Sequence, residues 1–223
     1  MESTKTHIYF VSGMAASTEI FEFLQFPEEE FELHFLEWML PISEKETIEH
    51  YAKRMSDLVT EENPVLIGVS FGGIMVQEMS KFLHPKKIII ISSIKSRDEL
   101  SNMLKLLQKL WIYKLFPSRI VEHVEIFSFL AIGKTLKTRF KLYKKYFSVR
   151  DRKYLNWAIY NVLYWKQKNP LENVLHIHGT KDVILSFKYI KNCIPIEKGT
   201  HIMIINKAKT ISEIITGSLK MLN

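Results

Sequence analysis

The chain has 223 residues, of which 47% are hydrophobic and 12% aromatic, so it can bury a substantial core and is not intrinsically disordered. No apolar run approaches the roughly 18–20 residues that cross a bilayer, which argues against a transmembrane helix. The formal net charge of +7 invites a nucleic-acid hypothesis, but no recognition motif accompanies the basic residues, so we expect no nucleic-acid binding.

The expected compartment is the cytoplasm. A lone cysteine, Cys193, excludes a disulfide within the chain and favours reducing surroundings. Glu2 lies where a signal peptide would carry basic residues, and the first apolar stretch is short. We therefore expect a first β-strand there and no signal peptide.

Short apolar runs alternate with helical patterns along most of the chain. The predicted strands are 7–12, 32–38, 64–70, 87–92, 174–178 and 192–196, and the predicted helices between them are 17–26, 43–60, 71–83 and 206–221. Several strands are apolar on both faces, most clearly the four isoleucines at 88–91, as is typical of parallel strands covered by helices on both sides. This order predicts an α/β fold with a doubly wound, mostly parallel sheet of about six strands.

The middle of the chain differs from the rest in charge. Residues 95–168 contain 17 basic and 5 acidic residues, whereas the remainder contains 14 basic and 19 acidic ones. Four aromatic-rich helices are predicted in this part, at 97–116, 118–130, 135–147 and 150–168. We predict two domains: a core of residues 1–94 and 170–223, and a basic helical cap of residues 95–169 inserted before the fifth strand.

The glycines indicate where a site lies. The chain has only eight, and six of them stand at or beside the carboxyl ends of predicted strands. These six are Gly13, Gly68, Gly72, Gly73, Gly179 and Gly199. Ligands of open α/β sheets bind at that edge, so we expect the functional site there.

The sharpest motif is Gly-Val-Ser-Phe-Gly-Gly at 68–73, which has the pattern G-x-S-x-G between a predicted strand and a predicted helix. A nucleophile elbow needs this context, because the sharp turn exposes the serine hydroxyl while strand and helix crowd together. Small residues must flank the turn, and Gly68, Gly72 and Gly73 provide them. Ser70 is therefore the candidate nucleophile.

A serine nucleophile needs a general base, and the base needs an orienting acid. Asp182 follows the predicted fifth strand in His-Gly-Thr-Lys-Asp, and His201 follows the last strand in Gly-Thr-His. We assign Asp182 as the orienting acid and His201 as the general base. Asp98, which follows the fourth strand, is an alternative acid.

An oxyanion hole requires two backbone N–H groups. Phe71, directly after the nucleophile, is expected to supply one of them. The loop after the first strand is expected to supply the other, and Met14 is the candidate because Gly13 would let the loop turn back over Ser70.

Other motifs carry less chemistry. His176 and His178 alternate on a strand without an apparent third metal ligand, so we interpret them as structural, and Cys193 as a buried thiol. Gly-Lys-Thr at 133–135 resembles the end of a phosphate-binding loop, but Ser128 stands where the first glycine belongs. We expect neither a metal nor a cofactor.

Together these motifs resemble the α/β-hydrolase superfamily, in particular its small, capped, cofactor-free serine hydrolases. The elbow is similar to that of carboxylesterases and thioesterases, and the segments around Asp182 and His201 are similar to the acid and histidine loops of the superfamily. The chain has Ser12-Gly13 where the superfamily commonly has His-Gly, and the superfamily's N-terminal antiparallel hairpin is missing. The serine nucleophile argues against the dehalogenases and epoxide hydrolases of this fold, which attack with aspartate.

The resemblance implies hydrolysis of an acyl ester or thioester. The basic cap favours an anionic small-molecule substrate, such as a thioester of coenzyme A or of a carrier protein. Two alternatives stay open: other chemistry on the same residues (aminopeptidase, C–C hydrolase or lyase), and a catalytically inactive module that binds a ligand or, less expected, a membrane surface.

Overall fold

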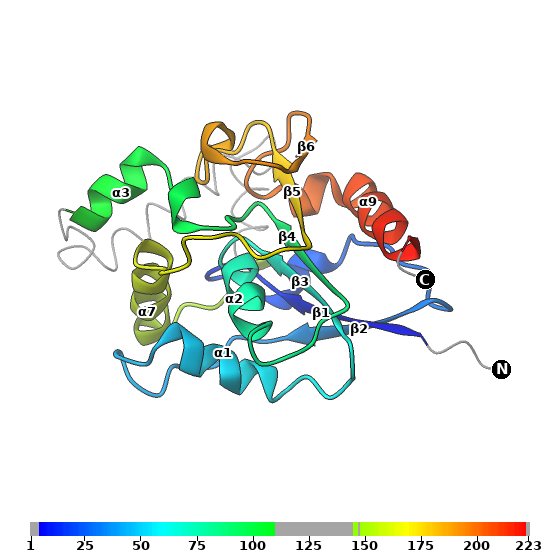
Figure 1. Ribbon diagram of the computed structural model, residues 1–223, viewed down its shortest axis with the longest axis horizontal. Helices are drawn as coiled ribbons and strands as arrows, with labels where there is room; N and C mark the ends of the chain where they lie inside the picture. Colours follow the sequence, from blue (N-terminus) through cyan, green and yellow to red (C-terminus); the bar gives the residue numbers. More distant parts are fainter. Residues whose placement is uncertain (1–4, 110–144, 147, 222–223) are drawn as a thin grey trace.

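The computed structural model describes residues 5–109, 145–146 and 148–221, and its centre is one sheet of six parallel strands (Figure 1). The strands run in the order β2-β1-β3-β4-β5-β6, so the chain winds outward from β1 in both directions. The predicted doubly wound sheet is confirmed, and within the described residues no antiparallel strand precedes β1. The strands are β1 (Thr6–Val11), β2 (Phe31–Leu36), β3 (Val65–Val69), β4 (Lys87–Ile91), β5 (Val174–Gly179) and β6 (Ile194–Ile196).

The two faces of the sheet pack into separate cores. Along β4, Ile88 and Ile90 join one core cluster while Ile89 and Ile91 join the other. Successive side chains of a strand point to opposite faces, so a strand in the middle of two helical layers needs an apolar residue at every position. This explains the continuous isoleucine run.

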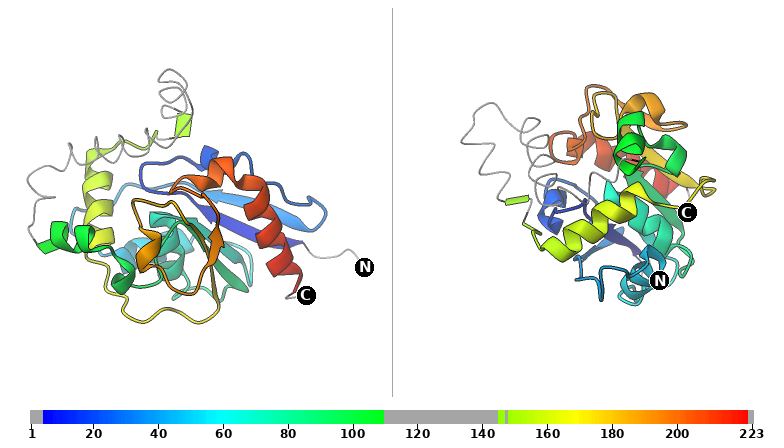
Figure 2. Two further views of the ribbon diagram at one scale, coloured as in Figure 1. Left: turned by 90° about the horizontal axis from the view of Figure 1, so that it is seen from above. Right: turned by 90° about the vertical axis from the view of Figure 1, so that its left-hand side faces the viewer.

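Helices cover both faces. The first face carries α1 (Ile48–Ser56), α2 (Phe71–Met79) and α7 (Arg152–Leu163), which lie together in Figure 1. The opposite face carries the short 3₁₀ helix η1 (Thr18–Phe21), α8 (Met203–Asn206) and α9 (Ala208–Lys220). Figure 2 also shows α9 and α7 on opposite sides of the sheet.

Several helices are shorter than predicted. In place of a helix over 17–26 the structure has only η1, and the helix predicted over 43–60 begins at Ile48. Thr47 is its N-cap, with a side chain that accepts a hydrogen bond from the His50 amide. The Glu46 carboxylate accepts from the Ile42 amide at 2.6 Å and pairs with Arg54, which holds the preceding residues in a turn.

The segment between β4 and β5 is described only in part. It contains the 3₁₀ helix η2 (Arg97–Glu99), α3 (Asn102–Lys109) and α7, where helices over 97–116 and 150–168 were predicted. The predicted helix at 118–130, the phosphate-loop-like residues 133–135 and most of the predicted helix at 135–147 lie outside the described residues.

The α7 helix joins the core of the sheet. Trp157 is buried, its ring lies 4.2 Å from that of Tyr51 on α1, and its Nε1 donates to the Glu46 carbonyl oxygen at 2.8 Å. The division into core and cap therefore remains a prediction, because this helix of the predicted cap packs with α1 and α2. No helix in the described ranges combines the length and apolar character that crossing a membrane requires.

The remaining 3₁₀ helix of the described residues, η3 (Phe187–Tyr189), follows β5.

Candidate active site

Ser70 lies between β3 and α2 with a strained backbone. Its φ is 52° and its ψ is −117°, a conformation that an L-residue adopts only where the surrounding structure imposes it. Two neighbours hold the turn: the Ser70 amide donates to the Ile91 carbonyl at 2.9 Å, and the Ser93 hydroxyl donates to the Ser70 carbonyl at 2.7 Å. The motif therefore forms the sharp strand-to-helix turn predicted for a nucleophile elbow.

The glycines of the elbow permit close backbone contact. A Cβ atom on Gly68 would lie 2.2 Å from the Gly72 carbonyl oxygen, and one on Gly72 would lie 2.2 Å from the Val11 carbonyl oxygen. A Cβ atom on Gly73 would lie 2.4 Å from the Ser93 hydroxyl oxygen. Side chains at these positions would push α2 away from β3, from the end of β1 and from the segment after β4, respectively.

The structure brings Ser70, His201 and Asp182 together, although 131 residues separate the first two. The Ser70 Oγ lies 2.9 Å from His201 Nε2, and His201 Nδ1 lies 2.8 Å from Asp182 Oδ2. A carboxylate accepts, so Nδ1–H donates to Asp182 and Nε2 presents its lone pair to the serine hydroxyl. This is the order of contacts that a nucleophile, a general base and an orienting acid require.

The Asp182 carboxylate is fully buried, and both of its oxygens accept hydrogen bonds. Its Oδ1 accepts from the amides of Ile184 and Leu185, both at 2.9 Å, while Oδ2 faces His201. Burial alone would raise the pKa of Asp182, but the charge and hydrogen bond of His201 and the Leu185 amide outweigh it, so the pKa lies below its ordinary value. The acid is therefore held ionised beside the histidine.

The loops that carry Asp182 and His201 are packed against each other. A Cβ on Gly179 would lie 2.3 Å from the Gly199 carbonyl oxygen, so only glycine allows the two loops to touch there. The Lys181 amide donates to that same carbonyl oxygen at 2.8 Å. These contacts set the spacing between Asp182 and His201.

The alternative acid, Asp98, lies elsewhere. It is exposed on η2, and its own carbonyl oxygen accepts from Lys105 Nζ at 3.0 Å. In the described part of the chain, His201 hydrogen-bonds to Asp182 and has no contact with Asp98. The geometry favours Asp182 as the orienting acid.

The loop after β1 differs in detail from its prediction. The φ of Gly13 is outside the left-handed region, and a Cβ there would make only an ordinary 3.5 Å contact with Ser70 Cβ. The left-handed residue of this loop is Ala15, with φ 64°. The turn therefore depends on Ala15, and Gly13 instead keeps the space beside Ser70 free of a side chain.

The two predicted oxyanion donors belong to the elbow and to the loop after β1. Met14 is half-buried in the loop after β1, and Phe71 is the buried first residue of α2. Within the described residues neither backbone N–H donates a hydrogen bond to another protein group.

Trp38 is a site residue that the sequence analysis did not single out. Its Nε1 lies 3.0 Å from the Ser12 hydroxyl and 3.1 Å from the Gly13 carbonyl oxygen, and donates to both. Its ring stacks on Phe71 with centroids 5.1 Å apart. The Trp38 side chain thus contacts both segments that carry candidate oxyanion donors. The only feature of the sequence that could have indicated this role is the position of Trp38 just after β2.

His176 and His178 form a buried pair behind the acid. The His178 Nε2–H donates to the Leu185 carbonyl oxygen at 2.8 Å, so its Nδ1 accepts from His176 Nε2–H at 3.1 Å. Burial, followed by the neighbouring His178, lowers the pKa of His176 to about 2, and burial also lowers the pKa of His178. Both rings are therefore neutral, and His178 Nε2 lies 3.4 Å from Asp182 Oδ2.

Cys193 lies just before β6 and is half-buried; burial raises the pKa of its thiol. A raised pKa keeps the sulfur protonated and unreactive near neutral pH, although the thiol, predicted to be buried, is only half-buried.

Comparison with known proteins identifies the fold. No protein-family model matches the chain, and no curated protein sequence matches it. Among solved structures, it is similar to a putative non-heme bromoperoxidase, BpoC, from Mycobacterium tuberculosis H37Rv (10% identity, 99% of this chain and 94% of that one, TM-score 0.73). It is also similar to a carboxylesterase structure from Nitrososphaera gargenis (14% identity, 98% and 91%, TM-score 0.73). A third neighbour is olei00960, a hydrolase from Oleispira antarctica (14% identity, 99% and 93%, TM-score 0.73).

These neighbours share the α/β-hydrolase fold, and the parallel sheet, the elbow after β3 and the covering helices agree with it. The chain therefore has the α/β-hydrolase fold. At these identities the likeness establishes the fold alone, and the chemistry must be argued from the site.

Proposed function

We propose that this protein is a serine hydrolase that cleaves an acyl ester or thioester through an acyl-enzyme intermediate. The observation that supports this is the continuous hydrogen-bonded series from Ser70 Oγ through His201 to Asp182, at 2.9 Å and 2.8 Å, on a strained elbow. Strain of this kind is costly, and it persists where function needs an exposed nucleophile.

In the proposed mechanism, the substrate carbonyl lies beside Ser70 with its oxygen toward the Met14 and Phe71 amides. The Ser70 oxygen attacks the carbonyl carbon as His201 Nε2 takes the hydroxyl proton, and the amides stabilise the resulting oxyanion. Asp182 stabilises the imidazolium. His201 then protonates the leaving alcohol or thiol, and a water deprotonated by the same nitrogen releases the acid and restores Ser70.

The similar structures support acyl chemistry. They include a carboxylesterase structure, a lipase-esterase related protein from Clostridium acetobutylicum ATCC 824, and ClbQ from the colibactin NRPS/PKS pathway (13% identity, 98% of each chain, TM-score 0.64). For the present chain an acyl ester or thioester is accordingly the first substrate class to test.

We further propose that the substrate is anionic, as coenzyme A and carrier-protein thioesters are. The excess of basic residues between 95 and 168 belongs to the chain segment that joins the carboxyl end of β4 to β5, and the carboxyl end of β4 is at the same edge of the parallel sheet as Ser70. A field of this sign increases the encounter rate with anions and is screened by salt. Raising the salt concentration should lower kcat/KM for an acyl-CoA and leave that for a neutral p-nitrophenyl ester unchanged; equal responses would refute electrostatic recruitment.

A panel of esters, thioesters and aminoacyl amides, assayed with the wild type and with Ser70→Ala, tests the function itself. We expect turnover of esters or thioesters that Ser70→Ala abolishes. Turnover confined to amides would indicate a peptidase instead, and no turnover together with tight ligand binding would indicate a binding module.

A further inference from the structure

Three metal-ligating side chains converge at the opposite end of the sheet from Ser70. They are His7 on β1 and Glu32 and His34 on β2, and they are the only such group in the ranges that the structure describes. We propose that His7, Glu32 and His34 form a binding site for a first-row divalent transition metal, with Zn²⁺ as the ion to test first.

The strand register places the three side chains together. His7 is paired with Glu32 across the parallel strands, and His34 lies two residues further along β2, so all three are on the same face. His7 Nδ1 lies 3.0 Å from His34 Nε2 and 3.9 Å from Glu32 Oε2. Two nitrogens bound to one tetrahedral zinc ion are about 3.3 Å apart, so the imidazoles need move only a few tenths of an ångström.

The imidazole of His34 is already held in place. It stacks on the Tyr9 ring, with centroids 4.3 Å apart and planes 11° from parallel. The Tyr9 hydroxyl in turn lies 3.4 Å from the Thr60 hydroxyl and accepts from the Thr60 amide at 3.3 Å. A ligand whose orientation is fixed before binding loses less entropy when the ion arrives.

His7 has an outer carboxylate that suits a metal ligand. Its second ring nitrogen, Nε2, lies 3.8 Å from Glu61 Oε2. Metal-bound histidines commonly donate their other ring N–H to a carboxylate, which fixes the tautomer that points the lone pair at the ion. The Glu61 side chain is 42% exposed, and a shift of about 1 Å would bring it within hydrogen-bonding distance of His7 Nε2, where it would fix the tautomer with the Nδ1 lone pair free for the ion.

The ligand set indicates the kind of metal. Two imidazoles and one carboxylate suit zinc, copper or nickel rather than magnesium or calcium, which take oxygen ligands. The side chains of His7 and Glu32 are 25% and 53% exposed, so an ion can enter and water can occupy the remaining position. A bound ion would join the edge strand β2 to β1.

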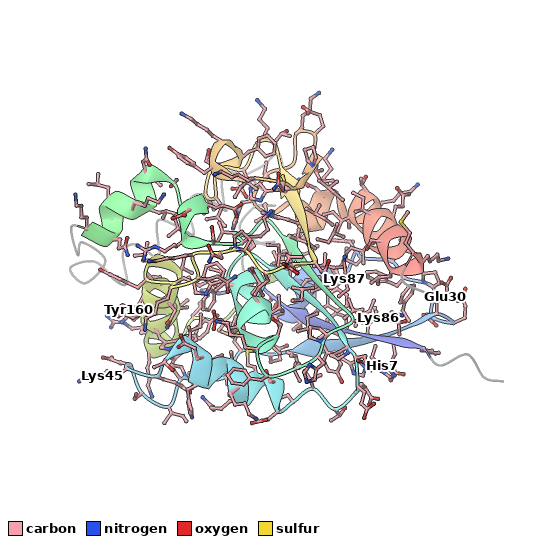
Figure 3. The ribbon with its side chains drawn as sticks, in the orientation of Figure 1. His7, Glu30, Lys45, Lys86, Lys87 and Tyr160 are labelled. Atoms are coloured by element: carbon pink, nitrogen blue, oxygen red, sulfur yellow. The ribbon has the colours of Figure 1, made fainter. Side chains whose placement is uncertain are left out.

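The site is separate from the candidate catalytic site. Figure 3 shows His7 at the end of the sheet where Lys87 begins β4, whereas Ser70 follows the other end of β3. Five to six strand residues, or about 16–20 Å, separate His7 from the loop after β1. Metal binding should therefore stabilise the fold without taking part in hydrolysis.

The test measures Zn²⁺ binding to the tag-free protein by competition with a zinc-chelating fluorophore at pH 7.5. We expect the double variant His7→Gln/His34→Gln to bind one Zn²⁺ ion fewer per chain than the wild type. Glu32→Gln is an exposed, isosteric change, so the variant should fold normally. Its affinity for that Zn²⁺ ion should be lower by about tenfold or more. His50→Gln is the matched control, because His50 also faces a carboxylate (Glu46, 2.8 Å) but, among the residues that the structure describes, belongs to no group of three metal-ligating side chains.

Thermal unfolding provides a second measurement. Zn²⁺ at one hundred times its dissociation constant should raise the Tm of the wild type by about 5–10 °C, and the shift should shrink in Glu32→Gln. If the histidine double variant and Glu32→Gln bind Zn²⁺ with the stoichiometry and affinity of the wild type, the proposal is wrong. Ester hydrolysis by Glu32→Gln should equal that of the wild type.

Discussion

Acid should destabilise the fold through the buried His176. The folded protein holds this ring neutral down to a pKa of about 2, whereas in the unfolded chain it has the ordinary value of 6.5. Between these values the unfolded state binds one more proton, so stability falls as the pH falls. At pH 5, which is 1.5 units below 6.5, His176 alone lowers the free energy of unfolding by about 2 kcal/mol relative to its value at neutral pH.

Urea unfolding at pH 7 and pH 5 measures this cost. The informative quantity is the difference between the wild type and His176→Gln, because the buried Glu99, whose pKa is raised by burial, changes stability in the opposite sense in both proteins. We expect the wild type to lose about 2 kcal/mol more than the variant between the two pH values. Gln77→Asn, a change in a buried amide that does not titrate, should lower stability equally at both.

A loss in His176→Gln as large as that in the wild type would refute this reasoning. It would mean that His176 is protonated in the folded state or already neutral in the unfolded one, and that the neutral pair behind Asp182 does not exist as described.

Three further predictions concern the elbow, the acid and the oxyanion loop. Gly72→Ala places a Cβ 2.2 Å from a backbone carbonyl oxygen and should lower the free energy of unfolding by about 1–3 kcal/mol, as measured by urea unfolding. Gly217→Ala, whose Cβ would have no atom within 4 Å, is the control and should raise the free energy of unfolding by about 0.5–1 kcal/mol. Asp182→Asn should lower kcat by about 10³–10⁴-fold, while Asp98→Asn should leave it within about twofold, as steady-state ester hydrolysis will show. Trp38→Phe removes the indole N–H but keeps an aromatic ring, so kcat should fall by about 10–100-fold with KM little changed; an unchanged kcat would mean that the loop needs no such support.

The sheet could be predicted from sequence because each strand carries its own signal. The isoleucine run of β4 and the glycines at the strand ends depend on local packing demands, and the chain order then fixes a parallel topology. The elbow was predictable for the same reason: its pattern, strand and helix are contiguous. Ser70 was proposed from its G-x-S-x-G motif, and Asp182 and His201 were proposed because they lie in loops that follow predicted strands.

Features that depend on contacts between distant segments could not be predicted. Trp38 reaches Ser12 across 26 residues, and His7 meets His34 across 27, through a strand register that no local pattern specifies. The start of α1 was misplaced because Glu46 folds back onto the Ile42 amide and Arg54 instead of continuing the helix. In each case a tertiary contact decided the local structure.

The central claim is that Ser70 is an activated nucleophile, and covalent labelling tests it most directly. A fluorophosphonate probe, followed by peptide mass spectrometry, should give one adduct on Ser70 in the wild type. The adduct should be absent from Ser70→Ala and present in Ser218→Ala, a matched change on α9. An unlabelled wild type, an adduct on another residue, or undiminished ester hydrolysis by Ser70→Ala would contradict the account.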